Sequence, residues 1–311
     1  MYFECIIGNG GGGTEIPLIV NCSSSFAGKT ITCTDGTTTL TDVCPNTSPY
    51  TVVFSLPNDG SWDVSGVIGG VTISETILIS AYEVDLIDFT DITVTVYGAV
   101  NDTVSYTGLD GATHTITLNS SGSASATVKV YSQGNTTLTF SSTIAKDASD
   151  LSKSYTKDIT FTPATTEIYV MPDGALYWYG YIKSGLGSFS RSGYTLYGTA
   201  LAGGTAETNK LNIPTASTNT YRGVGSDNAF TIENKYTKLK AHFDASGNGI
   251  QFGLVNSKTV NGTTTSFAYC QQSTSGNAII ENTIQSYGNA YAFYYAGNSQ
   301  QYGDCYALWL E

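Results

Sequence analysis

Apolar and polar residues alternate with a period of two along most of the chain, which is the spacing of strands that bury one face. Over residues 15–86 such segments are separated by the Gly, Pro, Asn and Asp residues of turns. The segments read PLIVNC, KTITCTD, TTLTDVC, YTVVFSL, SWDVSGV and VTISETILIS. Six or seven short strands in about 70 residues match the size of an immunoglobulin-like sandwich. We therefore predict one over this range, with Trp62 as its core aromatic residue.

A second block of the same kind follows over residues 87–164. Its segments read DITVTVYG, DTVSYTGL, THTITL, SATVKVYS, TTLTFSS and KDITFTP. Thr or Ser alternating with Val, Ile or Leu is typical of half-buried strands, which predicts a second immunoglobulin-like sandwich. Helical periodicity is hard to find, and the helix-like stretch at Ala145–Lys153 is short enough to be a turn.

The composition changes near residue 165, where most of the 22 tyrosines and longer loops of Gly, Asn and Ser begin. The strand-like segments there read ALYWYGYI, GYTLYGTA, KLNIPT, NAFTIE, TKLKAHFDA, IQFGLV, TSFAYCQQ, AIIENTI, AYAFYYAG and CYALWLE. About ten short strands predict a jelly-roll or lectin-like sandwich over residues 165–311. The predicted fold class is all-β: tandem Ig-like β-sandwiches followed by a jelly-roll-like β-sandwich.

Two segments of the last domain are crowded with aromatic residues. On a strand, alternation sends the three tyrosines of the first segment to one face and its tryptophan to the other. One face must be core, while rings on the other stack on sugars or anchor a protein interface. Ordinary core packing and contact between identical subunits are the alternatives. The candidate binding residues are Tyr177, Trp178, Tyr179, Tyr181, Tyr291, Tyr294 and Tyr295.

Residues 1–14 differ from everything after them. An apolar head, Met1–Ile7, precedes the sequence GNGGGG, which has the composition of a flexible linker. The head is too short to fold alone, and it suits addition as a strand to a neighbouring subunit or a docking protein. A frayed terminus is the alternative. The expected assembly residues are Tyr2, Phe3, Cys5, Ile6 and Ile7.

Charge and hydropathy exclude several classes of partner. The net charge is −12, from 25 acidic and 13 basic residues without a basic cluster, so a phosphate backbone would be repelled and nucleic acid is not an expected partner. No apolar run approaches the roughly 18–20 residues that span a membrane, and the first residues lack a secretory signal. We expect no membrane insertion and synthesis in a cytoplasm. Only 12% of residues are charged, which suits shells, fibres and adhesins.

No catalytic constellation is predicted, and we expect a protein without enzymatic activity. The two histidines, His114 and His242, stand in strand-like contexts without the neighbours that mark a triad or a metal site. No motif selects a pair of carboxylates for glycoside hydrolysis. The stretch Asp244–Gly249 opens like a calcium loop, but its twelfth position is Val255 in place of Glu, which favours a hairpin turn.

No cofactor is expected, with calcium at the first domain junction as the one metal hypothesis. Glu83, Asp85, Asp88 and Asp91 fall at this junction, where carboxylates could share an ion between two sandwiches. The alternative is a solvated acidic linker that resists edge-to-edge pairing of strands.

The six cysteines match no zinc-binding spacing. Cys22, Cys33 and Cys44 could bridge within the first sandwich, and Cys270 could meet Cys305 in the last. The alternative is that all six, Cys5 included, are free thiols that act as small hydrophobes.

Two stretches resemble a known family. The segment from KTITCTDG to ETILIS resembles an Ig-like module in virion proteins of gut Firmicutes phages and their prophages. The C-terminal stretch, with ALYWYGYI, TIENKYTKLKAHFDA and CYALWLE, resembles the jelly-roll domains that close structural and tail-fibre proteins of the same phages. The resemblance implies a virion component and leaves head, neck, tail and fibre open.

These observations predict a non-enzymatic bacteriophage virion structural protein of fibre or decoration type, assembled as a homo-oligomer. Its partners would be copies of itself, other virion proteins, and a host-surface glycan or receptor bound by the C-terminal domain. One alternative is a purely structural component of capsid, neck or tail, with its aromatic faces buried between subunits. A second is a bacterial surface adhesin or pilus-like subunit that polymerises by donating Met1–Ile7. A third is a depolymerase of host polysaccharide.

Overall fold

The computed structural model describes most of the chain, and nearly all of it is β-structure. The described residues are 16–78, 83–86, 88–182, 189–190, 195–196, 199–200, 205–213, 222–226, 229–246, 250–256, 259–260, 266–272, 276–296 and 302–311. Apart from one 3-10 turn, η1 (Ser24–Phe26), the elements in these ranges are strands. None of the described segments forms a helix of the length and apolarity that crossing a bilayer requires. The predicted all-β class is confirmed.

The chain forms two compact units. The first comprises residues 1–92, 128–137 and 160–165, and the second comprises residues 93–127, 138–159 and 166–311. The first sandwich lies entirely in the first unit. Strands of the second sandwich contribute residues to both units.

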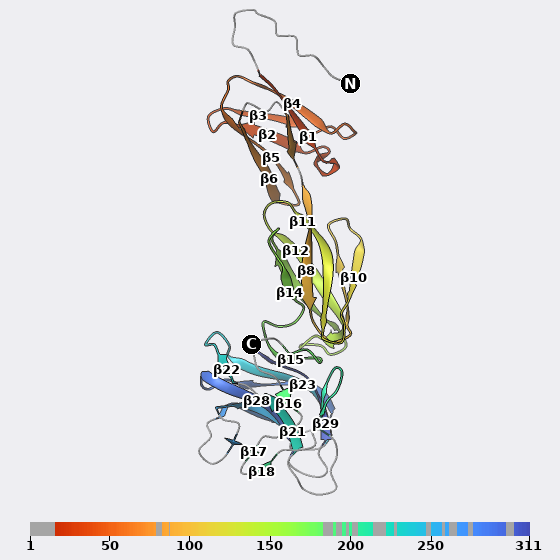
Figure 1. Ribbon diagram of the computed structural model, residues 1–311, viewed down its shortest axis with the longest axis vertical. Coiled ribbons are helices and arrows are strands. Elements are labelled where there is room, and N and C mark those ends of the chain that lie inside the picture. Colours follow the sequence, from red (N-terminus) through yellow and green to blue (C-terminus); the bar gives the residue numbers. More distant parts are fainter. Residues whose placement is uncertain are drawn as a thin grey trace, which may run out of the picture. The chain divides into compact units, whose positions relative to one another are not determined.

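The first sandwich has two sheets, with the strand orders β4-β1-β7 and β3-β2-β5-β6 (Figure 1). Its first strand, β1, pairs antiparallel with β4 and parallel with β7, so the first and last strands of the sandwich lie side by side. The bounds are β1 Ile16–Cys22, β2 Thr30–Thr34, β3 Thr39–Val43, β4 Thr51–Leu56, β5 Ser61–Ile68, β6 Val71–Leu78 and β7 Glu83–Leu86.

The period-two pattern builds the core of the first sandwich. Strand β5 buries every second residue, including Trp62 and Val64, and β4 follows the same rule. Trp62 is fully buried, as predicted for the core aromatic residue. Gly66 is needed for close packing, because a Cβ at that position would come within 2.6 Å of the ring of Phe26.

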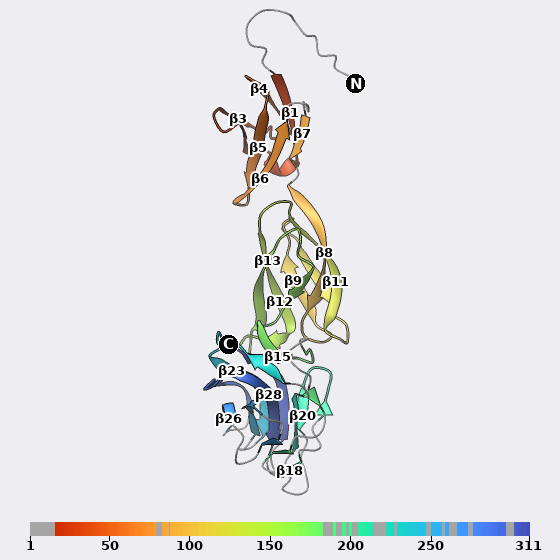
Figure 2. The same ribbon diagram turned by 60° about the vertical axis from the view of Figure 1, so that its left-hand side comes forward.

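The second sandwich repeats this plan, with the strand orders β10-β9-β12-β13 and β11-β8-β14 (Figure 2). Its first strand, β8, again pairs parallel with its last, β14. The bounds are β8 Phe89–Tyr97, β9 Thr103–Thr107, β10 Thr113–Thr117, β11 Ser123–Tyr131, β12 Thr136–Lys146, β13 Ser154–Phe161 and β14 Glu167–Tyr169. The helix-like stretch is a turn between β12 and β13, in which the Asp147 carboxylate accepts the Ser149 N–H at 2.7 Å.

A buried carboxylate fixes the end of β12. Asp102 is only 1% exposed. Its Oδ1 accepts hydrogen bonds from the Thr143 N–H at 2.9 Å, from the Thr143 hydroxyl at 2.7 Å and from the Ile144 N–H at 3.2 Å, and its Oδ2 accepts one from Ser142. These four hydrogen bonds tie three consecutive residues of the strand to one side chain. The backbone that leads to Lys146 is therefore held firmly.

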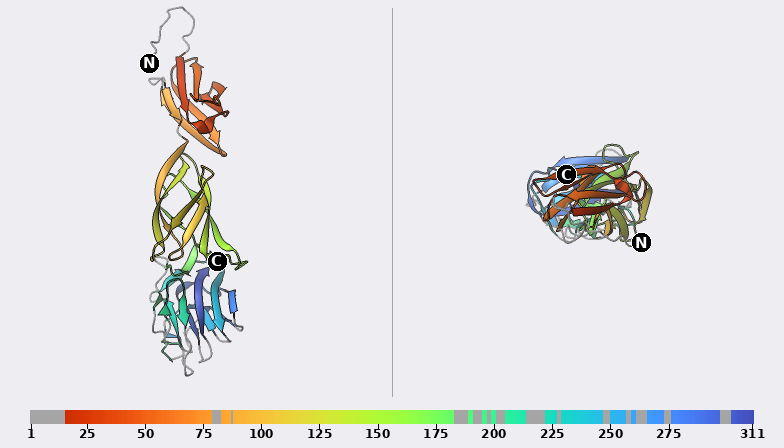
Figure 3. Two further views of the ribbon diagram at one scale, coloured as in Figure 1. Left: turned by 90° about the vertical axis from the view of Figure 1, so that its right-hand side faces the viewer. Right: turned by 90° about the horizontal axis from the view of Figure 1, so that it is seen from above.

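The C-terminal sandwich lies in the second unit and has two larger sheets. One has the order β19-β20-β29-β23-β27, with β15 paired to β29, and the other has the order β16-β21-β28-β24-β26, with β22 paired to β28. A small sheet has the order β18-β17-β25. Figure 3 shows these strands in green to blue. The jelly-roll-like class predicted for this part is confirmed.

The strands of the C-terminal sandwich vary from two to nine residues. Their bounds are β15 Gly174–Trp178, β16 Phe189–Ser190, β17 Thr195–Leu196, β18 Thr199–Ala200, β19 Thr205–Ala206, β20 Leu211–Ile213, β21 Arg222–Ser226, β22 Phe230–Ile232, β23 Lys238–Ser246, β24 Ile250–Val255, β25 Thr259–Val260, β26 Ser266–Gln272, β27 Gly276–Thr283, β28 Gly288–Ala296 and β29 Tyr302–Leu310.

The core of the C-terminal sandwich includes Phe243 of β23, Phe252 of β24 and Leu308 of β29. The hairpin predicted at Asp244–Gly249 is wrong, because β23 and β24 belong to different sheets. Strand β23 pairs with β27 and β29, whereas β24 pairs with β26 and β28. The connection therefore passes from one sheet to the other, which local turn signals do not reveal.

Candidate functional site

Strand β15 ends in a tight turn that decides where its aromatic residues lie. Tyr179 has a φ of 43° and Gly180 a φ of 92°. The N–H groups of Trp178 and Tyr181 each donate to the other residue's carbonyl at 2.8 Å. Two consecutive central residues with positive φ make a type I′ turn.

The alternation predicted through this segment is wrong, because the strand stops at Trp178. Tyr177 alone packs into the core of the C-terminal sandwich. The other three aromatic residues gather in a separate cluster together with Trp309 of β29. The turn has redirected Tyr179 to the side on which Trp178 lies.

Trp178 is the centre of an aromatic group. Its ring lies 4.9 Å from that of Tyr155 and 5.8 Å from that of Trp309, measured between centroids. The interplanar angles of 67° and 87° are edge-on, an arrangement that ring quadrupoles favour. Burial raises the pKa of Tyr155, so its hydroxyl keeps its proton and can donate.

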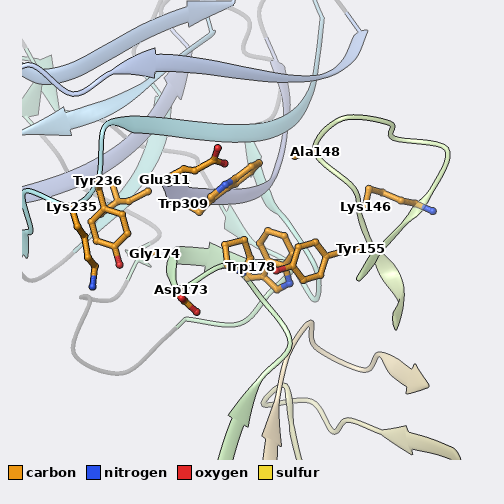
Figure 4. Close-up of a pocket in the computed structure, with 12 residues that line it drawn as sticks. Lys146, Ala148, Tyr155, Asp173, Gly174, Trp178, Lys235, Tyr236, Trp309 and Glu311 are labelled. Carbon is orange, nitrogen blue, oxygen red and sulfur yellow. The ribbon is translucent and has the colours of Figure 1, made fainter. Parts of the chain in front are cut away.

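These rings line a cavity of about 540 Å³ (Figure 4). All of the residues that line it belong to the second unit. Besides the three rings they include Tyr236 and Asp173. The volume falls within the roughly 300–1,000 Å³ typical of small-molecule sites. Aromatic walls with a few polar groups are the usual composition of such sites.

The polar groups of the cavity are charged side chains that already have partners. Asp173 is 85% exposed and pairs with Lys157 at 2.7 Å. Lys235 pairs with Glu233 at 2.9 Å and lies 5.0 Å from the centre of the Tyr236 ring. In Figure 4, Lys235 and Tyr236 lie on one side, Trp178 and Tyr155 on the other, and Asp173 between them. Exposed ion pairs are weak, so a ligand can compete for these groups.

The indole N–H of Trp178 is buried and has no hydrogen-bond acceptor among the described residues. The whole side chain is only 2% exposed. A buried donor without a partner costs about 1–3 kcal/mol, and native structures contain few of them. Trp178 lines the cavity, so this unpaired donor belongs to a ring that borders the space a ligand would occupy.

Three of the predicted binding residues are placed in packing positions. Tyr177, Tyr179 and Tyr181 are all buried. The Tyr181 ring lies 5.8 Å from that of Tyr97, and burial raises the Tyr181 pKa to about 12. None of the three is among the residues that line the cavity, so these side chains support the region around Trp178.

The remaining predicted binding and assembly residues are described only in part. Tyr291 lies half-buried on β28. Tyr294 and Tyr295 belong to the same strand, and their side chains lie outside the described part of the chain. The predicted assembly segment also lies outside the described residues: Tyr2, Phe3, Cys5, Ile6 and Ile7.

Among the residues that line the cavity, the sequence did not single out Tyr155, Asp173, Tyr236 or Trp309. Trp309 and Tyr236 stand in or beside segments that were read as strands. Nothing in the spacing connected either of them to Trp178, because they are distant in sequence and meet only in the folded chain.

The two histidines are bound to other side chains. His114 lies 3.0 Å from the Asp110 carboxylate, which lowers the pKa of that carboxyl group, and its ring stacks on Tyr106. His242 is buried, and its ring nitrogens lie 2.6 Å from the Tyr179 hydroxyl and 2.7 Å from the Asn277 side-chain oxygen. Burial lowers the pKa of His242.

The acidic junction and the cysteines do not form a metal site among the described residues, which contain no cluster of three potential ligands. Asp91 pairs with Lys129 at 3.1 Å, Asp88 is buried, and the side chains of Glu83 and Asp85 lie outside the description. Calcium binding there stays a prediction.

The described cysteines are free thiols: Cys22, Cys33, Cys44 and Cys305. The thiols of Cys22 and Cys44 are hydrogen-bonded to each other, and burial raises the pKa of Cys22 to about 12. Cys5 and the side chain of Cys270 lie outside the described part.

No protein-family model matches the chain, and no curated protein matches it. Among solved structures, the secreted serine protease VesC from Vibrio cholerae is similar over 81% of this chain and 48% of its own, with 10% identity and a TM-score of 0.25. This chain thus spans about half of that protease.

A structure of carbohydrate-binding modules from the beta-sandwich superfamily is similar over 72% of this chain and 98% of its own, with 10% identity and a TM-score of 0.24. Tripeptidyl peptidase 2 is similar over 81% and 18%, with 13% identity and a TM-score of 0.19. Similarities of this size carry no argument about function.

Proposed function

We propose that this chain is a non-enzymatic display and binding protein that holds a saccharide of a host surface in the cavity beside Trp178. The observation that carries the proposal is the unpaired, buried indole N–H of Trp178 in the wall of a cavity of about 540 Å³. A protein that had evolved only to pack this region would gain stability by supplying an acceptor.

The chemistry of the cavity suits a sugar. A pyranose ring has an apolar face of C–H groups and a rim of hydroxyls. The half-buried rings of Tyr155 and Tyr236 offer flat apolar surface, and their hydroxyls are donors. The Asp173 carboxylate accepts bonds from sugar hydroxyls, while the indole N–H of Trp178 donates to one.

We propose no catalytic role because the carboxylates of the cavity each form an ion pair with a lysine. The Asp173 carboxylate is tied to Lys157, and the Glu311 carboxylate lies 2.8 Å from Lys240. A hydrolase needs one carboxyl group kept protonated as the acid. Both of these carboxylates are instead paired with lysine.

The setting of this binding protein is proposed from the sequence. The two stretches that resemble modules of phage virion proteins support a fibre- or decoration-type virion component, with the tandem sandwiches as spacers. Many copies on one particle would convert weak single-site contacts into durable attachment. The partners would then be copies of the chain, other virion proteins and the host glycan.

A purely structural role in the particle is the second candidate. The burial of Tyr177, Tyr179 and Tyr181 favours it, because these rings already act as packing residues. In that case the cavity would be filled by a side chain of a neighbouring virion protein.

The test is a glycan array that carries neutral and acidic saccharides, together with bacterial wall polysaccharides. We expect the wild-type protein to bind a subset, and Trp178→Phe to weaken that binding about tenfold, the value of one hydrogen bond. Trp62→Phe is the matched control, since it also removes an unpaired buried indole N–H and leaves the cavity intact. An array that stays blank, or equal binding by Trp178→Phe and wild type, would contradict the proposal.

A further inference from the structure

A chain of hydrogen bonds runs from the cavity into the C-terminal sandwich. The backbone N–H of Lys146, a residue that lines the cavity, donates to the Tyr179 hydroxyl oxygen at 3.0 Å. That oxygen lies 2.6 Å from Nδ1 of His242, and Nε2 of His242 lies 2.7 Å from Oδ1 of Asn277. Tyr179 and His242 are each only 3% exposed.

Matching each donor of these hydrogen bonds to an acceptor leaves one arrangement of the protons. The Tyr179 oxygen accepts the Lys146 N–H, so its own single proton points to His242. Nδ1 of His242 must then be an acceptor, and Nε2 must carry the ring proton that it donates to Asn277. Every group is satisfied only when the imidazole is neutral.

Other groups around His242 bear on its protonation in opposite directions. The positive charge of Lys146 disfavours a charged ring and the Asp244 carboxylate favours it, but burial outweighs both. Lys240 lies two residues earlier on the same face of β23, where it is paired with Glu281 and Glu311.

The ring of Tyr306 covers His242 at 4.9 Å between centroids. On the neighbouring strands, His242 faces Ile279 of β27 and Ala307 of β29 in the sheet register, and neither residue carries a charge.

Tyr179 contacts two segments of the chain that line the cavity. Its hydroxyl holds the end of β12, from which the chain runs on through Ala148 to Tyr155 in the cavity lining. In the second segment it follows Trp178 directly, with the two rings 5.2 Å apart. Tyr179 is therefore a positioning residue for the cavity, and His242 in turn positions Tyr179.

We propose that the Tyr179–His242 hydrogen bond holds these two segments of the cavity lining together at neutral pH and releases them in mild acid. This inference rests on the proposed function only in assigning a ligand to the cavity. The step itself is a protonation, in which Nδ1 of His242 takes a proton from solvent. The new N–H must donate to the Tyr179 oxygen, and the phenolic proton loses its acceptor.

The first test needs no ligand. NMR of the wild-type chain follows the ring signals of His242 and His114 and the amide of Lys146 between pH 7.5 and 4.5. We expect the Lys146 amide shift to change with the midpoint of His242, which lies below the ordinary imidazole pKa value of 6.5. A Lys146 amide that stays constant while His242 titrates would overturn the inference.

Hydrogen exchange of the Lys146 amide, divided by its intrinsic rate at each pH, gives a second readout. We expect at least a tenfold loss of protection in wild type between pH 7 and pH 5. Tyr179→Phe should show that loss at every pH, because the phenyl ring cannot accept the bond. His114→Asn is the matched control and should behave as wild type; acid sensitivity that follows His114 would contradict the assignment.

Ligand binding then separates this inference from the proposed function. With any saccharide that the array identifies, we expect affinity at pH 5 to fall at least tenfold below that at pH 7.5, and Tyr179→Phe to bind weakly at both. If no saccharide binds but the Lys146 amide follows His242, the proposed function fails and the positioning role stands. If a saccharide binds equally at both pH values, the positioning role fails alone.

Discussion

Two buried tryptophans of this protein share one defect and differ in their surroundings. The indole N–H groups of Trp62 and Trp178 both lack an acceptor among the described residues. Trp62 lies in the hydrophobic core of the first sandwich, enclosed by other apolar side chains. Trp178 lies in the wall of a cavity, beside polar groups such as Asp173.

The difference shows that an unpaired buried donor is not by itself a binding site. In the first sandwich it is a cost that a well-packed core offsets, because a large aromatic ring buries much apolar area. In the second unit the donor belongs to a ring that lines a cavity. Variants of the two units can test whether these two tryptophans have different roles.

The largest expected effect is on stability. Trp62→Ala should lower the free energy of unfolding of the first unit by about 3–5 kcal/mol, since it leaves a large hole in a closed core. The loss in free energy of unfolding for Trp178→Ala should be at or below the lower end of that range, because one side of Trp178 already borders a cavity. Urea unfolding of the full chain, followed by circular dichroism, measures both. Equal losses for the two variants would remove the distinction.

The next effect concerns the turn that sets Tyr179 in place. Gly180→Ala should cost about 2–3 kcal/mol, because a Cβ there meets the Thr208 carbonyl oxygen at 2.0 Å in addition to the strain of a φ of 92°. Gly36→Ala in the first sandwich is the control, since its φ is 88° but the space around it is open. The same urea measurement should show the smaller loss for Gly36→Ala, and the reverse order would contradict the turn geometry.

The smallest effect is a difference in acid sensitivity between the two units. Burial lowers the pKa of His242 below its ordinary value of 6.5. As the pH falls below 6.5, the unfolded chain takes up a proton that the folded ring resists, so the second unit loses stability. Above 6.5 this group contributes no pH dependence. Both histidines belong to the second unit, so the first unit should show no histidine-linked loss.

Urea midpoints at pH 7.5 and 5.5 measure this difference. In the Trp62→Phe variant both remaining tryptophans, Trp178 and Trp309, report on the second unit by fluorescence. We expect their midpoint to be lower at pH 5.5, with His114→Asn retaining the shift. A midpoint that is unchanged, or a shift that disappears with His114→Asn, would argue against His242 as its source.

The fold class could be predicted from the sequence because a strand that buries one face shows alternating apolar and polar residues. Every second residue of β5 is apolar, and those residues, Trp62 among them, form the core. The alternation of side chains between two faces does not extend to Tyr179. A type I′ turn usually carries Asn-Gly or Gly-Gly, and Tyr179-Gly180 gives only half of that signal. The sequence therefore did not show that the strand ends at Trp178, and the predicted faces of its aromatic residues were wrong.

The sequence by itself determined that this protein is a series of β-sandwiches with aromatic residues concentrated toward its C-terminal end. Only the tertiary structure decided which of those residues border a cavity, and it selected Trp178 along with the unpredicted Tyr155, Tyr236 and Trp309. The reason is physical. The alternation of apolar and polar residues shows whether a side chain faces inward, because that depends on its neighbours along the strand. A cavity, by contrast, forms where segments distant in sequence pack incompletely against each other.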